Sequence, residues 1–151
     1  IETPTADEAQ KFSSRFGVER SFHFTRRLLP PRDPATSKEA TIPIGTRVLA
    51  VAGIARPESF FNALHSYGYT IVNTMTYPDH HAFIESDLAD LNRELQNHEA
   101  DYVVTTEKDF VRLFPHMPLA FPMVWVPLSI SIEPVDHFRT WISDHLKKAR
   151  E

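Results

Sequence analysis

Short apolar runs alternate with amphipathic segments along most of the chain after Gly45. Four runs have the length and composition of β-strands, and they cover residues 47–52, 69–75, 101–105 and 123–126. The run at 47–52 is apolar without interruption, which is typical of a strand buried on both faces. Apolar residues at helical spacing predict four helices, which begin at Pro57, Ser86, Glu107 and Pro134.

Strands that alternate with helices at this spacing indicate βαβ units with right-handed crossovers. We therefore expect an α/β fold with an open, mostly parallel sheet and helices on both faces, a Rossmann-like arrangement of three layers. Gly68 is placed to end the first of these helices, and Pro115 closes the third, which spans 107–114. In the final helix, the predicted apolar stripe consists of Val135, Phe138, Ile142 and Leu146.

The first 45 residues follow a different pattern. A short helix is predicted over 6–16 and a half-buried strand over 21–25, where phenylalanines alternate with polar residues. The stretch from 28 to 45 contains four prolines, which remove backbone donors and interrupt helices. We interpret it as a connecting segment with room for an edge strand, and we predict a division into residues 1–45 and an α/β domain over 46–151.

Composition excludes several classes of protein. The chain has 151 residues, no cysteine and a formal net charge of −4, so disulfides and thiolate metal sites are absent and general nucleic-acid binding is disfavoured. No apolar run approaches the length of a membrane span, and no signal peptide is recognisable. Because the first residue is Ile1 rather than methionine, we expect a processed product or a piece of a longer protein.

The unusual polar segments each follow a predicted strand. They cover residues 53–57, 76–81 and 105–109. Ligands of open parallel sheets bind outside the carboxyl ends of the strands, and these segments should therefore converge on one edge. This convergence is stronger support for a functional site than any single motif.

Asp79, His80 and His81 are the central candidates, because a carboxylate beside imidazoles can handle protons. The alternative interpretation is a solvated loop that begins with a Pro-Asp turn. Arg56 is either an anion clamp or a solvated arginine at a helix start.

Two further candidates belong to the segment that follows the third strand of this series. Thr106 has the position of a helix cap, and Lys108 either neutralises an anion or pairs with its neighbours. Gly53 permits a tight turn between strand and helix.

The sequence contains neither a Walker A loop nor a Gly-x-Gly-x-x-Gly fingerprint, since its four glycines are far apart. The chain therefore has no evident cradle for a nucleoside triphosphate and should not hold ATP alone. We also predict no metal site in it.

The motifs resemble the C-terminal part of tetraacyldisaccharide 4'-kinase, the lipid A kinase family of Gram-negative bacteria. The similarity covers roughly residues 46–133, and it rests on 48–57, Phe60-Phe61, Leu64, Gly68, 77–81, Asp87-Leu88, 105–109, 111–113 and 126–128. It implies transfer of the γ-phosphate of ATP, with Mg²⁺, to the 4'-hydroxyl of a lipid A disaccharide precursor. It also implies peripheral association with the cytoplasmic face of the inner membrane.

In that family the Walker A loop, the Mg²⁺-binding acids and the aspartate proposed as base belong to the N-terminal half. This chain departs from the pattern by lacking that half, so we expect the 151 residues alone to be inactive. The resemblance assigns to His80 the support of this base and to Asp79 the orientation of His80. Arg56 and Lys108 are weaker candidates for anion contacts, with Thr106 beside them, and the role of His81 stays open.

Two other functions remain possible on the sequence. Asp-His-His also names a family of metal-dependent phosphoesterases, but these need further aspartates at strand ends. Here the first strand is followed by Gly-Ile-Ala-Arg, which contains no acidic residue. The other is a non-catalytic binding module that docks a partner domain.

Overall fold

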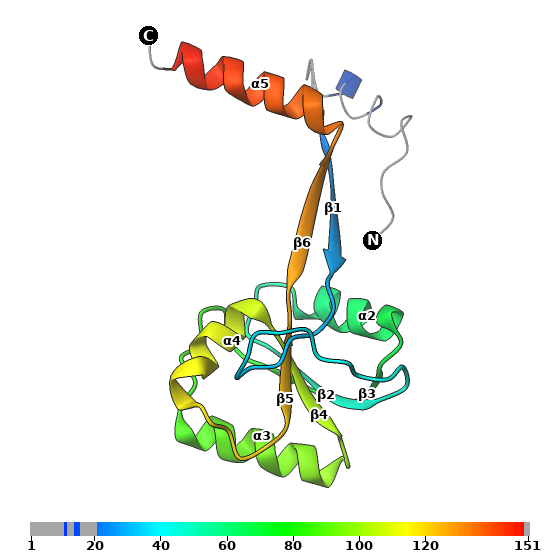
Figure 1. Cartoon of the computed structure of the whole chain (residues 1–151), viewed down its shortest axis with the longest axis vertical. Helices are drawn as coiled ribbons and strands as arrows, with labels where there is room; N and C mark the ends of the chain where they lie inside the picture. The colour runs from blue at the N-terminus through cyan, green and yellow to red at the C-terminus, as the bar shows by residue number, and fades with distance from the viewer. Residues whose placement is uncertain (1–10, 12–13, 16–20, 150–151) are drawn as a thin grey trace. The chain divides into compact units, whose positions relative to one another are not determined.

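The computed structural model describes residues 11, 14, 15 and 21–149. By its internal contacts the chain divides into two compact units, residues 28–128 and the combined ends 1–27 and 129–151. Figure 1 shows the elements of both. The helix predicted over 6–16 lies outside the described residues, apart from residues 11, 14 and 15.

The 28–128 unit is built on a parallel sheet of four strands in the order β3-β2-β4-β5. Its strands are β2 (Arg47–Ala52), β3 (Thr70–Thr76), β4 (Tyr102–Thr106) and β5 (Met123–Val126). Its helices are α2 (Pro57–Tyr67), α3 (Glu85–Asn97) and α4 (Glu107–Leu113), and the 3-10 turn η1 (Phe114–His116) follows α4. The predicted α/β fold is confirmed, and these elements lie within one or two residues of the predicted ranges.

Local chemistry explains where these helices begin and end. Pro57 occupies the first position of α2, where its missing N–H is not needed. Gly68 ends the helix with φ 104°, in the left-handed region that residues with a side chain rarely adopt. Thr106 caps α4, because its hydroxyl accepts a hydrogen bond from the Asp109 N–H.

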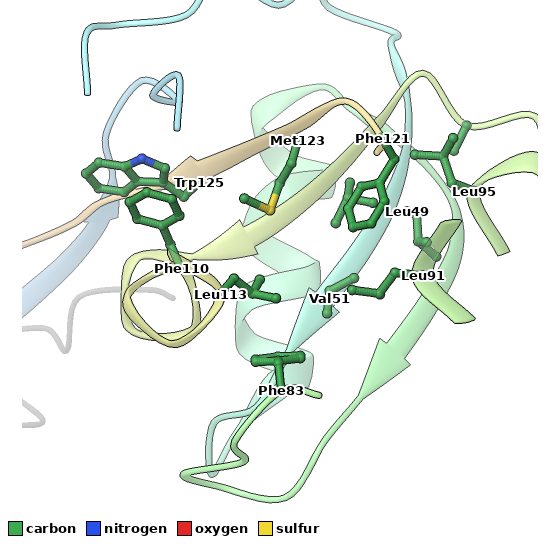
Figure 2. Close-up of a cluster of buried hydrophobic side chains, with 12 residues drawn as sticks. Leu49, Val51, Phe83, Leu91, Leu95, Phe110, Leu113, Phe121, Met123 and Trp125 are labelled. Atoms are coloured by element: carbon green, nitrogen blue, oxygen red, sulfur yellow. The ribbon is translucent and has the colours of Figure 1, made fainter. Parts of the chain in front are cut away.

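Both faces of the sheet are covered by apolar side chains. Leu49 and Val51 of β2 point to the face that α3 and α4 cover, and Val48 and Ala50 point to the face that α2 covers. Figure 2 shows the first of these clusters, in which Phe110 stacks on Trp125 with ring centroids 5.1 Å apart. Residues 48–52 are completely buried, so the prediction of a strand buried on both faces is confirmed.

The proline-rich segment, which runs between β1 and β2, packs onto the α/β unit. Arg32 forms an isolated antiparallel bridge with Trp125, and the Leu29 N–H donates to the carbonyl of Pro127. The segment thus satisfies part of the free edge of β5, which an unpaired strand would leave open. This grouping by contacts differs from the predicted division after residue 45, which stays a prediction for the domain organisation.

The other unit contains β1 (His23–Leu28), β6 (Leu128–Glu133) and α5 (Val135–Lys148). β1 and β6 form a two-stranded sheet, with Leu28 and Leu128 at the boundary between the units. β6 is absent from the predicted elements, although its sequence LSISIE alternates with the period of a strand. No residue of α5 is buried, and Val135, Ile142 and Leu146 of the predicted apolar stripe are exposed.

Candidate active site at the carboxyl edge of the sheet

The three polar segments singled out in the sequence leave the sheet at the same end. We call this end the carboxyl edge and define it by residues 53–56, 77–84 and 105–112. β2 and β4 are neighbours, but the chain leaves β2 towards β3 and leaves β4 towards β5, on opposite sides. In open α/β sheets, ligands bind outside the strand ends at such a reversal of chain direction.

Asp109 connects the ends of β2 and β4. Its carboxylate is completely buried, and Oδ2 accepts hydrogen bonds from the Gly53 N–H and from the Thr106 hydroxyl, each at 2.8 Å. A buried carboxylate without such partners would cost several kcal/mol. The requirement for these partners therefore fixes the first turn of α4 against the turn that follows β2.

Gly53 is the residue that lets this contact form. A Cβ atom at this position would lie 3.0 Å from Oδ1 of Asp109 and 3.3 Å from the carbonyl oxygen of Pro78. From the sequence, Gly53 is expected to permit a tight turn. The structure gives a different physical reason, the close approach of the segments that follow β3 and β4.

Arg112 extends the network from the buried carboxylate to His80. Its Nη1 lies 3.3 Å from Oδ1 of Asp109, and its Nη2 lies 2.9 Å from Nδ1 of His80. The side chain of His80 is 73% exposed, and its backbone has φ 66°. A positive φ is uncommon for histidine, and the surrounding contacts stabilise it here.

Asp79 is held by a different residue of α4. Its Oδ1 accepts from Lys108 Nζ at 2.5 Å and from the His80 backbone N–H at 3.0 Å. The Lys108 hydrogen bond, with smaller contributions from His80, keeps the pKa of Asp79 below its usual value despite some desolvation. Asp79 is therefore ionised at neutral pH, and its Oδ2 lies 3.7 Å from Nε2 of His80.

His81 points to a separate group of side chains. Its Nε2 lies 2.8 Å from Oδ2 of Asp87, and its ring stacks on Tyr77 with centroids 4.7 Å apart. Burial opposes ionisation of Asp87, but hydrogen bonds from the Ile84 N–H and His81 outweigh it and lower its pKa. Burial, with the charges of Asp87 and Asp90, raises the pKa of Tyr77 to about 12, so the phenol stays neutral.

The structure brings together four of the six candidates and leaves two apart. Asp79, His80, Thr106 and Lys108 belong to one network around α4. His81 bonds to Asp87 instead. Arg56 is exposed at the residue before α2, and its side chain forms no hydrogen bond or ion pair with any residue that the structure describes.

Asp109, Arg112 and Asp87 are not among the candidates predicted from the sequence. The spacing Thr106-x-x-Asp109 is that of a capping box, which could have indicated the bond between these two side chains. Nothing local indicated the contact between Arg112 and His80, because the two residues are 32 positions apart.

At the carboxyl edge, the His80 imidazole is exposed, and the polar side chains beside it already have partners within this chain. Asp79, His80 and His81 each contact a different residue, Lys108, Arg112 and Asp87 respectively. Within residues 11, 14, 15 and 21–149, no cluster of three or more histidine, aspartate or glutamate side chains is placed to hold a metal ion. The arrangement suits hydrogen bonding by His80 to a group outside this unit.

Comparison with protein families gives one match over nearly the whole chain. The family described as tetraacyldisaccharide-1-P 4'-kinase matches residues 2–147. The tetraacyldisaccharide 4'-kinase of Syntrophus aciditrophicus is 38% identical over 103 residues, which are 68% of this chain and 28% of that protein. The tetraacyldisaccharide 4'-kinase of Methylobacterium nodulans is 41% identical over 119 residues, which are 79% of this chain and 33% of that protein. The chain thus spans about a third of the length of these curated relatives.

A solved structure with a similar fold is LpxK from Aquifex aeolicus, described as an "apo" form in complex with ATP. The match has a TM-score of 0.52 and 18% sequence identity, and it covers 82% of this chain and 35% of that one. At this identity the similarity supports the fold.

We expect Gly53→Val to lower the free energy of unfolding by about 2–3 kcal/mol, because its side chain would push apart the segments that Asp109 connects. Chemical denaturation measures this. Ala55→Val is a control in the same turn, since Ala55 is exposed and its replacement should change stability by less than about 0.5 kcal/mol. If Gly53→Val were as stable as the wild type, this would contradict the close approach of the segments after β3 and β4 to Gly53.

We expect Asp87→Asn to lower the free energy of unfolding by about 1–2 kcal/mol at pH 7, because two hydrogen bonds to the carboxylate are weakened. The pKa of Asp87 is lower in the folded chain, so its contribution is complete above about pH 4 to 5 and is lost as the pH falls through the folded-state pKa. Urea unfolding of both proteins from pH 7 downwards should show their difference shrinking.

Asp90→Asn is the control for this pH series, because Asp90 lies on the same helix and its pair with Arg93 is solvent-exposed. A difference between Asp87→Asn and the wild type that stayed constant with pH would contradict the assignment.

Proposed function

Because this chain belongs to the tetraacyldisaccharide-1-P 4'-kinase family, we propose that it is the C-terminal part of a lipid A kinase. The kinase transfers the γ-phosphate of ATP to the 4'-hydroxyl of a tetraacyldisaccharide 1-phosphate. This is a phosphotransferase step in the biosynthesis of lipid A and hence of lipopolysaccharide. The names of the relatives support the reaction, and the length of the match supports the assignment to one part of the enzyme.

The observation that carries this proposal is the presentation of the Asp79-His80 pair at the carboxyl edge. Two residues of α4, Lys108 and Arg112, hold the pair from one side, and the His80 ring remains largely exposed. Phosphoryl transfer depends mainly on positioning and charge stabilisation. An exposed imidazole in a defined orientation is therefore suited to complete a site on an adjoining domain.

ATP and Mg²⁺ would be bound mainly by a P-loop half of the same protein. The 151 residues contain no phosphate-binding loop, and the described part offers no cluster of three or more carboxylates and imidazoles for a cation. ATP supplies the transferred phosphoryl group. The relative from Aquifex aeolicus, whose structure is described as a complex with ATP, supports the use of this nucleotide.

His80 is proposed to support an aspartate of the P-loop half that accepts the proton of the 4'-hydroxyl. Asp79 keeps the loop in place, because it bonds to the His80 backbone and to Lys108. Arg56 is the better placed of the two cationic candidates for an anionic group of nucleotide or lipid, since its side chain has no ionic partner among the described residues. Lys108 would have to exchange its bond with Asp79.

Thr106 and His81 are candidates whose polar groups already have partners within this chain. The Thr106 hydroxyl donates to Asp109 and accepts from its backbone N–H. His81 is bonded to Asp87. Both residues are therefore proposed to shape the site rather than to bind the substrate directly.

We further propose that the full protein associates peripherally with the cytoplasmic face of the inner membrane, because its acceptor is a lipid. Among the described residues, no helix is long and apolar enough to cross a membrane.

The deciding experiment measures transfer of radiolabelled γ-phosphate from ATP to the disaccharide lipid. We expect product from a protein that joins a P-loop half to this chain, and none from the 151 residues alone. Activity of the chain alone would show a nucleotide site that this proposal lacks. If the joined protein hydrolysed phosphoesters in a metal-dependent way and formed no phosphorylated disaccharide lipid, the phosphoesterase alternative would replace the proposed kinase function.

His80→Ala in the joined protein should lower kcat by at least about 100-fold, the usual scale for losing a group that assists proton transfer. The thermal unfolding temperature should change little, because the His80 side chain is mostly exposed. His65→Ala, at an exposed position of α2, is the matched control and should keep wild-type kinetics. An unchanged kcat in His80→Ala would remove His80 from the mechanism.

A further inference from the structure

The guanidinium group of Arg112 contacts a buried residue with one of its terminal nitrogens and an exposed residue with the other. Nη1 faces the completely buried carboxylate of Asp109 at 3.3 Å, and Nη2 faces Nδ1 of the exposed His80 ring at 2.9 Å. The Arg112 side chain is itself only 21% exposed. The planar guanidinium group, held between these two partners, has little freedom to rotate.

The buried end of this contact fixes the orientation of the guanidinium. Asp109 is held in place, because its other oxygen accepts hydrogen bonds from the Gly53 N–H and from the Thr106 hydroxyl. These bonds join the ends of β2 and β4 to the first turn of α4. The position of Nη2 at the surface is thus determined by the core of the sheet.

The chemistry of arginine decides the state of the ring that it contacts. A guanidinium has five N–H donors and no acceptor. Nδ1 of His80 must therefore carry a lone pair, and in the neutral imidazole the proton resides on Nε2. Nε2 has no hydrogen bond with any described residue, and Oδ2 of Asp79 lies 3.7 Å from it.

We propose that Arg112 is a positioning residue that holds His80 through Nδ1 and leaves its Nε2–H as the exposed donor. This rests on the proposed function, in which the acceptor is a carboxylate of the P-loop half. His80 then donates a hydrogen bond that orients this carboxylate, and the carboxylate receives the proton of the substrate hydroxyl. Arg112, rather than Asp79, makes the short contact that orients the ring.

The arrangement of His80 can be tested on the 151-residue chain, without any kinase activity. Nitrogen-15 spectra of the chain labelled at histidine and arginine are recorded at alkaline pH, where imidazole is neutral. We expect a protonated Nε2, an unprotonated Nδ1, and a scalar coupling between Nδ1 and Nη2 of Arg112 across the hydrogen bond. His80→Gln identifies the resonances by their loss.

Two variants complete this measurement. Arg112→Met removes the donor, and Arg112→Lys keeps a positive charge beside Asp109 in case the first variant does not fold. In at least one folded variant, the His80 nitrogen shifts should move towards those of His65, an exposed histidine on α2. A proton on Nδ1 in the wild type, or unchanged His80 shifts in the variants, would overturn the proposal.

The consequence for catalysis is tested in the joined protein by a double-mutant cycle. Arg112→Lys should lower kcat about 10-fold or more and change the KM values for ATP and lipid by less than about twofold. In the His80→Ala background the same substitution should have no further effect. An equal loss of kcat in both backgrounds would show a merely structural role and would overturn the positioning role.

Arg93→Lys is the matched control, because exposed Arg93 lies on α3 and pairs with the partly exposed Asp90. It should leave kcat unchanged. If the wild-type joined protein transferred no phosphate, the proposed function would fail, and the spectra of the chain would still decide whether Arg112 holds His80.

Discussion

The buried carboxylate of Asp109 accepts hydrogen bonds from the turn after β2 and from the cap of α4, and it pairs with Arg112. Within the described residues, Asp109 is the charged residue without solvent exposure. Removing a carboxylate from water is costly unless nearly all its lone pairs are satisfied. The segments that supply these donors are therefore constrained to one arrangement, and the geometry of the carboxyl edge depends on it.

This constraint reaches the surface through α4. Lys108 and Arg112 lie on the same short helix as Asp109, and they contact Asp79 and His80 of the loop after β3. The loop accepts a positive φ at His80, which costs some backbone energy that the ion pair and hydrogen bonds offset. A loop held in an uncommon conformation by a rigid neighbour is pre-organised, so little ordering would remain on binding of the group proposed to contact His80.

The family assignment and the geometry are complementary. The chain spans about a third of its curated relatives, and it presents an exposed imidazole whose Nε2 forms no hydrogen bond with any described residue. The kinase proposed above, divided between a phosphate-binding part and this part, would account for both observations. The sheet would serve mainly as a support, because its core is covered on both faces and the polar groups gather at one end.

The sequence alone determined the elements of the α/β unit, because strand and helix periodicity, Pro57, Gly68 and Thr106 are local signals that tertiary contacts did not override. It also indicated that Asp79, His80 and Lys108 would meet at one edge, since parallel strands end together. Only the tertiary structure decided which residues bond to one another and which strands pair. The Gly53–Asp109 bond joins residues 56 positions apart, and β6 pairs with a strand about 100 residues earlier. Likewise, Val135, Ile142 and Leu146 of the apolar stripe of α5 are exposed, whereas Phe138 packs against Phe22. Such pairings depend on the packing of distant segments, and no local pattern of residues encodes them.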